Sequence, residues 1–129
     1  MIKVKVFKQS AYPISSPKIK SVLRDFLKEK GIVSDAEVSV ALVGESRMLD
    51  LARKYLKEKG ILHNVLSFPA KEVRGEFKYP MDETIQLGEI VVCYPKACLE
   101  AGEEVVLVEG KVIELIKHGA LHLLGIHHP

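Results

Sequence analysis

Two hydrophobic periodicities alternate along this chain of 129 residues, and their order is the strongest constraint on its fold. Apolar residues recur at every second position in a half-buried strand, and three to four positions apart on one face of a helix. Strand patterns occupy four segments, namely Ile2–Phe7, Ala36–Val43, 65–68 and 87–94. Amphipathic helical patterns occupy residues 17–30 and 45–59, each followed by a glycine that can end a helix. The chain therefore predicts strands and helices in one fold.

The last part of the chain predicts a buried helix. Residues 103–124 are apolar on most sides of a helical projection, which is typical of a helix enclosed by other elements. Either Gly102 or Gly110 could interrupt this helix, so its first residue is not determined. Pro95 can begin a helix directly after the fourth strand. With a long loop over residues 69–86, the order of elements predicts an α+β fold. We expect a small sheet of about four strands packed by helices, with a buried C-terminal helix that carries a metal site.

Length and composition predict one domain over residues 1–129. No segment reaches the roughly 18 consecutive apolar residues of a membrane-spanning helix, and the first ten residues lack the apolar core of a signal peptide. Cys93 and Cys98 match no common zinc or redox spacing and favour a reducing compartment. We therefore expect a cytoplasmic protein without membrane contact. Its oligomeric state does not follow from the sequence.

Four of the five histidines lie between positions 118 and 128, in the order HGALHLLGIHH. Positions i and i+4 of a helix lie on the same face, so His118 and His122 can share one ion. Gly125 suits the end of that helix, because glycine accepts the left-handed conformation that reverses the chain. After the reversal His128 can reach the same ion, and the adjacent His127 is the alternative third ligand.

Three neutral imidazoles and one water form the open tetrahedral site of a catalytic zinc. We therefore predict one zinc ion per chain, bound by His118, His122 and His128. Such an ion polarises a phosphoryl or carbonyl oxygen and activates water, which predicts a hydrolase. The same spacing occurs in metzincin proteases, but these need a glutamate directly after the first histidine as general base. Gly119 stands there, which argues against peptide hydrolysis by that mechanism.

The charges are divided unevenly along the chain. Residues 1–78 carry 16 lysines and arginines against 9 acidic residues, whereas residues 79–129 carry 3 against 8. A basic N-terminal portion can attract a polyanion such as RNA toward a site elsewhere on the molecule, although it is also compatible with solvated helix surfaces. The asymmetry supports an RNA-binding function without establishing it.

Three sequence blocks resemble those of a known family, the YbeY-type bacterial endoribonucleases that act as rRNA maturation factors. HGALHLLGIHH resembles the family's HGxLHLxGYDH, HNVLSFP at residues 63–69 resembles T[DN]VLSFP, and LGEI at residues 87–90 resembles LGDI. The resemblance covers the chain from about residue 45 to the end. It implies a four-stranded sheet and a zinc held by three histidines in a cleft. It also implies hydrolysis of single-stranded RNA in ribosome assembly and quality control, with rRNA and the ribosomal small subunit as partners.

The resemblance also assigns individual residues. By position, it places the zinc ligands on the three histidines already named, and it places Asn64 and Ser67 on the strand that lines the cleft. We expect Asn64 to bind substrate and Ser67 to act in catalysis. The family's arginine before the T[DN]VLSFP block is absent here, and Lys57 is the nearest cation, although lysine lacks the planar fork of arginine. Lys57 is thus a predicted catalytic residue, and Arg53, one turn earlier, is the alternative cation and a predicted substrate-binding residue.

Two other functions are compatible with the same residues. One is a different metallohydrolase that acts on a peptide or a small ester at the three-histidine centre. The other is a non-catalytic factor in which zinc only stabilises the C-terminus and the basic surface binds rRNA. Loss of RNA cleavage on metal removal, with the fold intact, would distinguish the enzyme from the structural factor.

Overall fold

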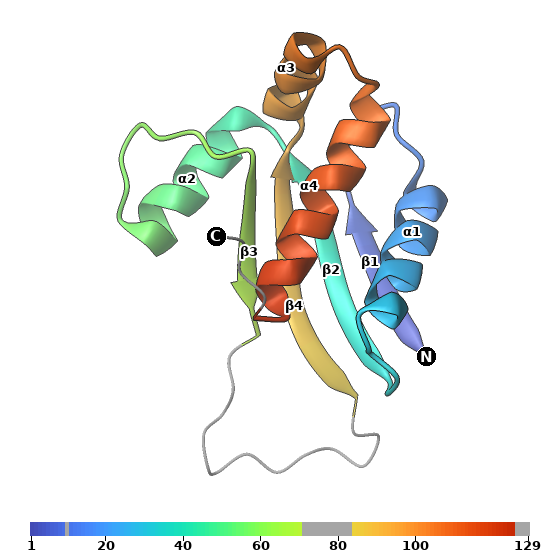
Figure 1. Cartoon of the computed structure of the whole chain (residues 1–129). Coiled ribbons are helices and arrows are strands. Elements are labelled where there is room, and N and C mark those ends of the chain that lie inside the picture. The colour runs from blue at the N-terminus through green and yellow to red at the C-terminus, as the bar shows by residue number, and fades with distance from the viewer. Residues whose placement is uncertain (10, 71–83, 126–129) are drawn as a thin grey trace.

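The fold is a four-stranded sheet flanked by helices (Figure 1). The computed structural model describes residues 1–9, 11–70 and 84–125, and within them the strands lie in the order β1-β2-β4-β3. The strands are β1 (Ile2–Phe7), β2 (Ala36–Val43), β3 (Val65–Pro69) and β4 (Ile85–Cys93). The helices are α1 (Ser16–Glu29), α2 (Glu45–Leu56), α3 (Tyr94–Glu104) and α4 (Val108–Leu123). The predicted α+β class and the sheet of about four strands are confirmed.

The sheet is mixed, and β3 is one of its edges. β1, β2 and β4 are parallel, whereas β3 pairs with β4 in the antiparallel sense. Val40 in β2 is aligned with Val6 of β1 and with Ile90 of β4. Parallel neighbours need a long crossover, which α1 provides between β1 and β2. Pro69 ends β3, as expected for a residue without an amide hydrogen in an edge strand.

Helices α1 and α4 cover one face of the sheet (Figure 1). The alternation along β2 turns Val38 and Val40 toward these helices, and both are almost completely buried. Leu23 of α1 and Val112 of α4 have no exposed surface and belong to the same core. The larger of the two apolar clusters therefore lies between these two helices and the sheet.

Helix α2 packs on the opposite face. Its Met48 has no exposed surface and lies in one cluster with Val91 and Cys93 of β4. The neighbouring residues Ile90 and Val92 belong to the cluster on the α4 side. Residues 90–93 of β4 are thus buried on both faces, which agrees with their unbroken apolar sequence, whereas Ile85, Gln86 and Glu89 nearer its start are exposed.

The helix predicted over residues 103–124 is wrong in its extent. Two helices occupy this region, because α3 ends at Glu104 and α4 begins at Val108. Val105 between them has φ 57°, in the left-handed region that ends a helix. A β-branched residue is unfavourable there, so the packing of α3 and α4 imposes the turn against local preference. Pro95 lies in the first turn of α3, as predicted for a helix that follows the fourth strand.

Two further boundaries differ from the prediction by two or more residues. α2 ends at Leu56 instead of residue 59, and Lys57 caps it with a left-handed φ of 60°. β4 begins at Ile85, two residues earlier than predicted. Most of the loop predicted over residues 69–86 lies outside the described residues, which resume at Thr84.

A helix that spans a membrane needs about 20 mainly apolar residues. In the part of the chain that the structure describes, no helix is long and apolar enough to cross a membrane.

Candidate functional site

The candidate site lies where α4 packs against the edge strand β3. Val65 of β3 packs with the core on the α4 side, whereas Phe68 packs on the α2 side. The hydroxyl group of Ser67 donates a hydrogen bond to the backbone carbonyl of Gly119, with an Oγ···O distance of 2.9 Å. β3 and α4 are therefore joined by a direct hydrogen bond next to His118.

Gly119 lies where α4 approaches the sheet most tightly. A Cβ atom at this position would be 2.7 Å from Ile90 Cγ2 and 3.0 Å from Ser67 Oγ. Ile90 has no exposed surface, so its side chain has no space into which to move. A glutamate at position 119 would require α4 to shift away from the sheet. The metzincin general base is therefore absent from the sequence, and the packing of α4 on the sheet leaves no space for it.

His118 and His122 lie one turn apart on α4. Their Nε2 atoms are 3.1 Å apart and their ring centroids 4.7 Å apart. His118 is exposed and His122 is partly exposed, while Gly119 and Ala120 beside them are buried. The structure brings the two imidazoles together, as their spacing of four residues predicts.

The separation of these two nitrogens suits a shared metal ion. Two nitrogens about 2.0–2.1 Å from a tetrahedral zinc lie roughly 3.3 Å from each other, close to the observed 3.1 Å. His128, the predicted third ligand, and His127, its alternative, lie outside the described residues. Within the described ranges, no three histidine, cysteine or acidic side chains are grouped to hold a metal ion. Two of the three predicted ligands are placed, and zinc binding stays a prediction.

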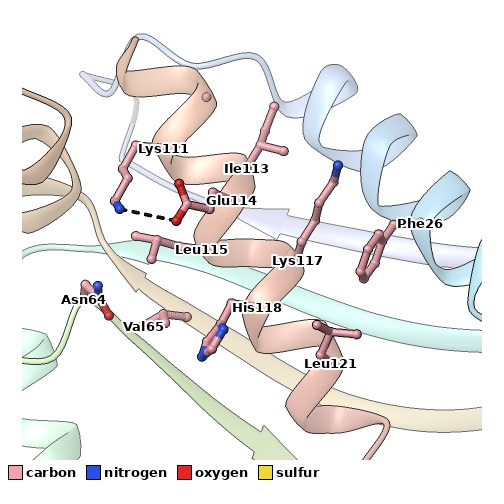
Figure 2. Close-up of a pocket in the computed structure, with 11 residues that line it drawn as sticks. Phe26, Asn64, Val65, Lys111, Ile113, Glu114, Leu115, Lys117, His118 and Leu121 are labelled. Carbon is pink, nitrogen blue, oxygen red and sulfur yellow. Dashed lines mark hydrogen bonds and ion pairs between the residues drawn. The ribbon is translucent and has the colours of Figure 1, made fainter. Parts of the chain in front are cut away.

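A cavity of about 600 Å³ follows α4 from His118 toward Lys111 (Figure 2). Asn64, directly before β3, and Val65, its first residue, line it together with His118. Figure 2 shows Asn64, Val65, Lys111 and His118 on the same flank of α4. The Asn64 amide nitrogen donates to both carboxylate oxygens of Glu100, at 3.0 and 3.3 Å. The structure thus brings the predicted substrate-binding residue Asn64 to the same cavity as His118.

The two predicted cations lie apart from this cavity, on and after α2. Arg53 forms an ion pair with Asp50, with an N···O distance of 3.0 Å. Both line a separate hollow of about 450 Å³, to which Arg47 and Lys54 also contribute. Lys57 is exposed at the C-terminal end of α2. Neither Arg53 nor Lys57 is among the residues that line the cavity of His118, and their functional roles stay predictions.

Lys111 is a buried charged residue that the sequence analysis missed. Its side-chain nitrogen lies 2.8 Å from a carboxylate oxygen of Glu104, 3.5 Å from one of Glu114 and 3.8 Å from one of Glu100. The hydrogen bond with Glu104, supported by the other two carboxylates, raises the pKa of Lys111 in spite of its burial. A lysine directly before Val112, on the buried face of an apolar helix, was the available signal.

The fold and the site define a small α+β protein with a pair of histidines on α4, of which His118 lines a cavity. The family model described as Endoribonuclease YbeY matches residues 6–129 of the chain. The chain therefore belongs to the Endoribonuclease YbeY family. The match begins at residue 6, so the similarity extends well beyond the region from residue 45 onward that the sequence blocks indicate.

Individual relatives agree with this assignment. A protein of Dehalococcoides mccartyi named Endoribonuclease YbeY is 33% identical over 122 residues, which cover 89% of this chain and 70% of the relative. A protein of Acinetobacter baumannii with the same name is 31% identical over 124 residues, covering 95% and 75%. The solution structure of TM1509 from Thermotoga maritima matches with a TM-score of 0.62 at 26% identity, over 100% of this chain and 75% of that one. The predicted family, and the prediction of an enzyme of this family, are confirmed.

Proposed function

We propose that the chain is a zinc-dependent endoribonuclease that cleaves single-stranded RNA and acts in rRNA maturation, ribosome assembly and quality control. The observation that carries the proposal is the pair of imidazole nitrogens 3.1 Å apart on α4, at the border of a cavity. Membership of the endoribonuclease family supplies the reaction class. The relatives from Dehalococcoides mccartyi and Acinetobacter baumannii carry the same name.

In this proposal His118, His122 and His128 hold one zinc ion, with His127 as the alternative to His128. The bound ion would supply a Lewis acid that withdraws negative charge from a phosphodiester group and favours hydrolysis by water. The spacing of the two described imidazole nitrogens fits this donor set.

The chain itself supplies positioning and charge. Asn64 lines the cavity and binds the RNA strand there. Ser67 holds the backbone of Gly119 against β3 and thereby keeps the adjacent His118 in place. Arg53 and Lys57, on and after α2, attract phosphate groups of the strand as it approaches, because cations give RNA binding most of its affinity.

Single strands suit this site better than duplexes. A cavity of about 600 Å³ has the size of a small-molecule pocket and accepts one or two nucleotides. In duplex RNA the bases are stacked and paired, so a nucleotide cannot enter such a cavity without melting of the helix. We therefore expect the preferred substrate to be a loop, an end or another unpaired segment.

The central experiment compares the wild-type protein with His122→Ala on a labelled single-stranded RNA and on a duplex of the same sequence. We expect the wild-type protein to cut the single strand in preference to the duplex, and His122→Ala to lose cleavage together with its zinc. Metal content is measured on the same preparations, and circular dichroism reports the fold. Equal cleavage by the two proteins would refute the nuclease proposal.

Further histidine variants serve as controls. His63 Nε2 lies 2.5 Å from Glu58 Oε1, which is not one of the proposed zinc ligands, so His63→Ala is expected to keep its zinc. His127→Ala and His128→Ala identify the third ligand, because the protein loses its zinc only when the residue that binds the ion is replaced. If a chelator unfolds the wild-type protein while RNA binding persists, zinc has only a structural role.

The ribosomal part of the proposal has its own test. The purified protein is sedimented with isolated small ribosomal subunits at low and high salt. Co-sedimentation that decreases with salt is expected from the excess of basic residues in the sequence of residues 1–78. Absence of binding at low salt would contradict the ribosomal role. It would not contradict the nuclease activity, which the cleavage assay tests separately.

A further inference from the structure

A partly buried chain of polar groups joins α4, α3 and β3 beside the proposed site. Glu100 of α3 is at its centre and accepts hydrogen bonds from the Asn64 amide nitrogen at 3.0 and 3.3 Å. Lys111 of α4 lies 3.8 Å from one carboxylate oxygen of Glu100, and Lys96 lies 3.8 Å from the other. The exposed fraction of the side chain is 19% for Glu100 and 6% for Lys111. Glu100 and Lys111 are therefore largely shielded from solvent.

The carboxylate of Glu100 determines which way the Asn64 amide faces. An ionised carboxylate only accepts hydrogen bonds, whereas an amide group has a donating and an accepting end. The amide nitrogen of Asn64 must therefore face Glu100, and the amide oxygen must lie on the other side. Figure 2 shows the Asn64 nitrogen turned toward the end where Lys111 lies and the oxygen away from it. Because Asn64 lines the cavity and its amide nitrogen is bound to Glu100, the end of the amide that is left for a ligand is the accepting oxygen.

This orientation depends on Lys111. Glu104 and Glu114 are bound to the same lysine nitrogen as Glu100, so removal of its charge leaves three carboxylates close together. Like charges this close repel one another, which favours movement of the Glu100 side chain away from Asn64. Once Glu100 no longer accepts from the amide nitrogen, the Asn64 amide is free to turn over. The raised pKa of Lys111 agrees with a lysine that stays charged in this network.

We propose that Lys111 and Glu100 are positioning residues that hold the Asn64 amide oxygen toward the cavity, where it accepts a hydrogen bond from the bound RNA. This inference rests on the proposed function. The donor is a ribose 2′-hydroxyl or an N–H group of a base, because a phosphodiester group carries no hydrogen to donate. Asn64 thus contacts the nucleoside part of the RNA, whereas the cations of the chain contact its phosphates.

The orientation is tested first without RNA. In nitrogen–proton spectra of the full chain, we expect the Asn64 side-chain amide signals to be shifted and slow to exchange in the wild-type protein. Lys111→Met should move them toward the values of a solvated asparagine, and Lys111→Arg should restore them. Lys18→Met is the matched control, because Lys18 is bound to Glu109 of α4 at 2.7 Å and its loss changes the net charge equally. Asn64 signals that are the same in Lys111→Met and wild type would overturn the positioning role.

The effect on RNA is tested by a double-mutant cycle. Loss of one hydrogen bond is expected to raise KM for single-stranded RNA roughly fivefold in Asn64→Ala and in Lys111→Met, with kcat little changed. If Lys111 acts through Asn64, the double variant also shows roughly a fivefold increase, whereas independent effects would give about 25-fold. A KM increase in the double variant equal to the product of the two single increases would overturn the positioning role. A wild-type protein that neither binds nor cleaves RNA would instead overturn the proposed function itself.

Modified RNAs identify the donor. Affinity is measured in the His122→Ala background, where no cleavage is expected. A single 2′-deoxy substitution that weakens binding roughly fivefold with Asn64 present, and not in Asn64→Ala, identifies a ribose hydroxyl. The same pattern with inosine in place of guanosine identifies a base amino group. If every substitution affects both proteins equally, Asn64 does not accept a hydrogen bond from RNA and the proposal is refuted.

Discussion

Replacement of Gly119 by alanine has two opposite effects on stability, and the size of each is known. Alanine is favoured over glycine inside a helix by about 1 kcal/mol, which would stabilise α4. The new methyl group, however, would lie 2.7 Å from Ile90 Cγ2, where carbon atoms normally keep about 3.5–4.0 Å. Overpacking of a closed core costs about 1–3 kcal/mol, and an overlap of roughly 1 Å against a buried side chain belongs in the upper part of that range. We therefore expect Gly119→Ala to lower the free energy of unfolding by about 1–2 kcal/mol.

Gly110 provides a matched control on the same helix. A Cβ atom added there meets nothing within 4 Å, so Gly110→Ala keeps the helix gain without the overlap. This variant is expected to be up to about 1 kcal/mol more stable than the wild type. The two variants should then differ by about 2–3 kcal/mol, or roughly 10 °C in melting temperature for a chain of this size. Urea and thermal unfolding followed by circular dichroism measure the difference.

The result that would refute this reasoning is a Gly119→Ala protein as stable as Gly110→Ala, because α4 would then not contact β4 as closely as described. The cause of a loss can be identified in an Ile90→Ala background, which removes the Cγ2 atom. There Gly119→Ala should no longer destabilise the protein, since the two substitutions share one contact. A loss of the same size in both backgrounds would point to Ser67, whose Oγ lies 3.0 Å from the added Cβ.

Three further predictions concern Ser67, Cys93 and the salt dependence of RNA binding. Ser67→Ala removes the hydrogen bond to Gly119 and should lower the free energy of unfolding by about 1 kcal/mol; unchanged stability in urea would contradict this role. Burial raises the pKa of the Cys93 thiol above its usual 9.0. Because the folded state then favours the neutral thiol, the contribution of Cys93 to the free energy of unfolding should be fully present below pH 9.0. It should be lost as the pH rises above this value. Cys93→Ala should make that decline shallower, and an identical slope would exclude Cys93 as its source. Finally, RNA affinity should fall roughly 20-fold from about 50 to 200 mM salt if three phosphates are neutralised, which fluorescence anisotropy measures.

Local patterns in the sequence were sufficient for most of the elements and for the pairing of His118 with His122. Alternation and helical periodicity predicted all four strands of the described sheet and the helices α1 and α2, because each pattern reports which side of a short segment is buried. The contact between His118 and His122 followed from the covalent geometry of a helix, in which residues four apart share a face. The α+β class and the family were predicted for the same reason, since both depend on the order and local sequence of segments.

Only the tertiary structure placed distant segments against one another. It located β3 at the sheet edge beside β4, ended α3 at Glu104 with the next residue, Val105, in a conformation against local preference, and showed that Gly119 is a packing requirement. The hydrogen bond between Ser67 and Gly119 joins residues 52 positions apart, and the one between Asn64 and Glu100 joins residues 36 positions apart. Periodicity within a segment contains no information on the register between segments, which is determined by how whole surfaces fit together. The sequence by itself therefore determined the paired histidines, whereas the cavity beside them and the buried Lys111 were decided by packing.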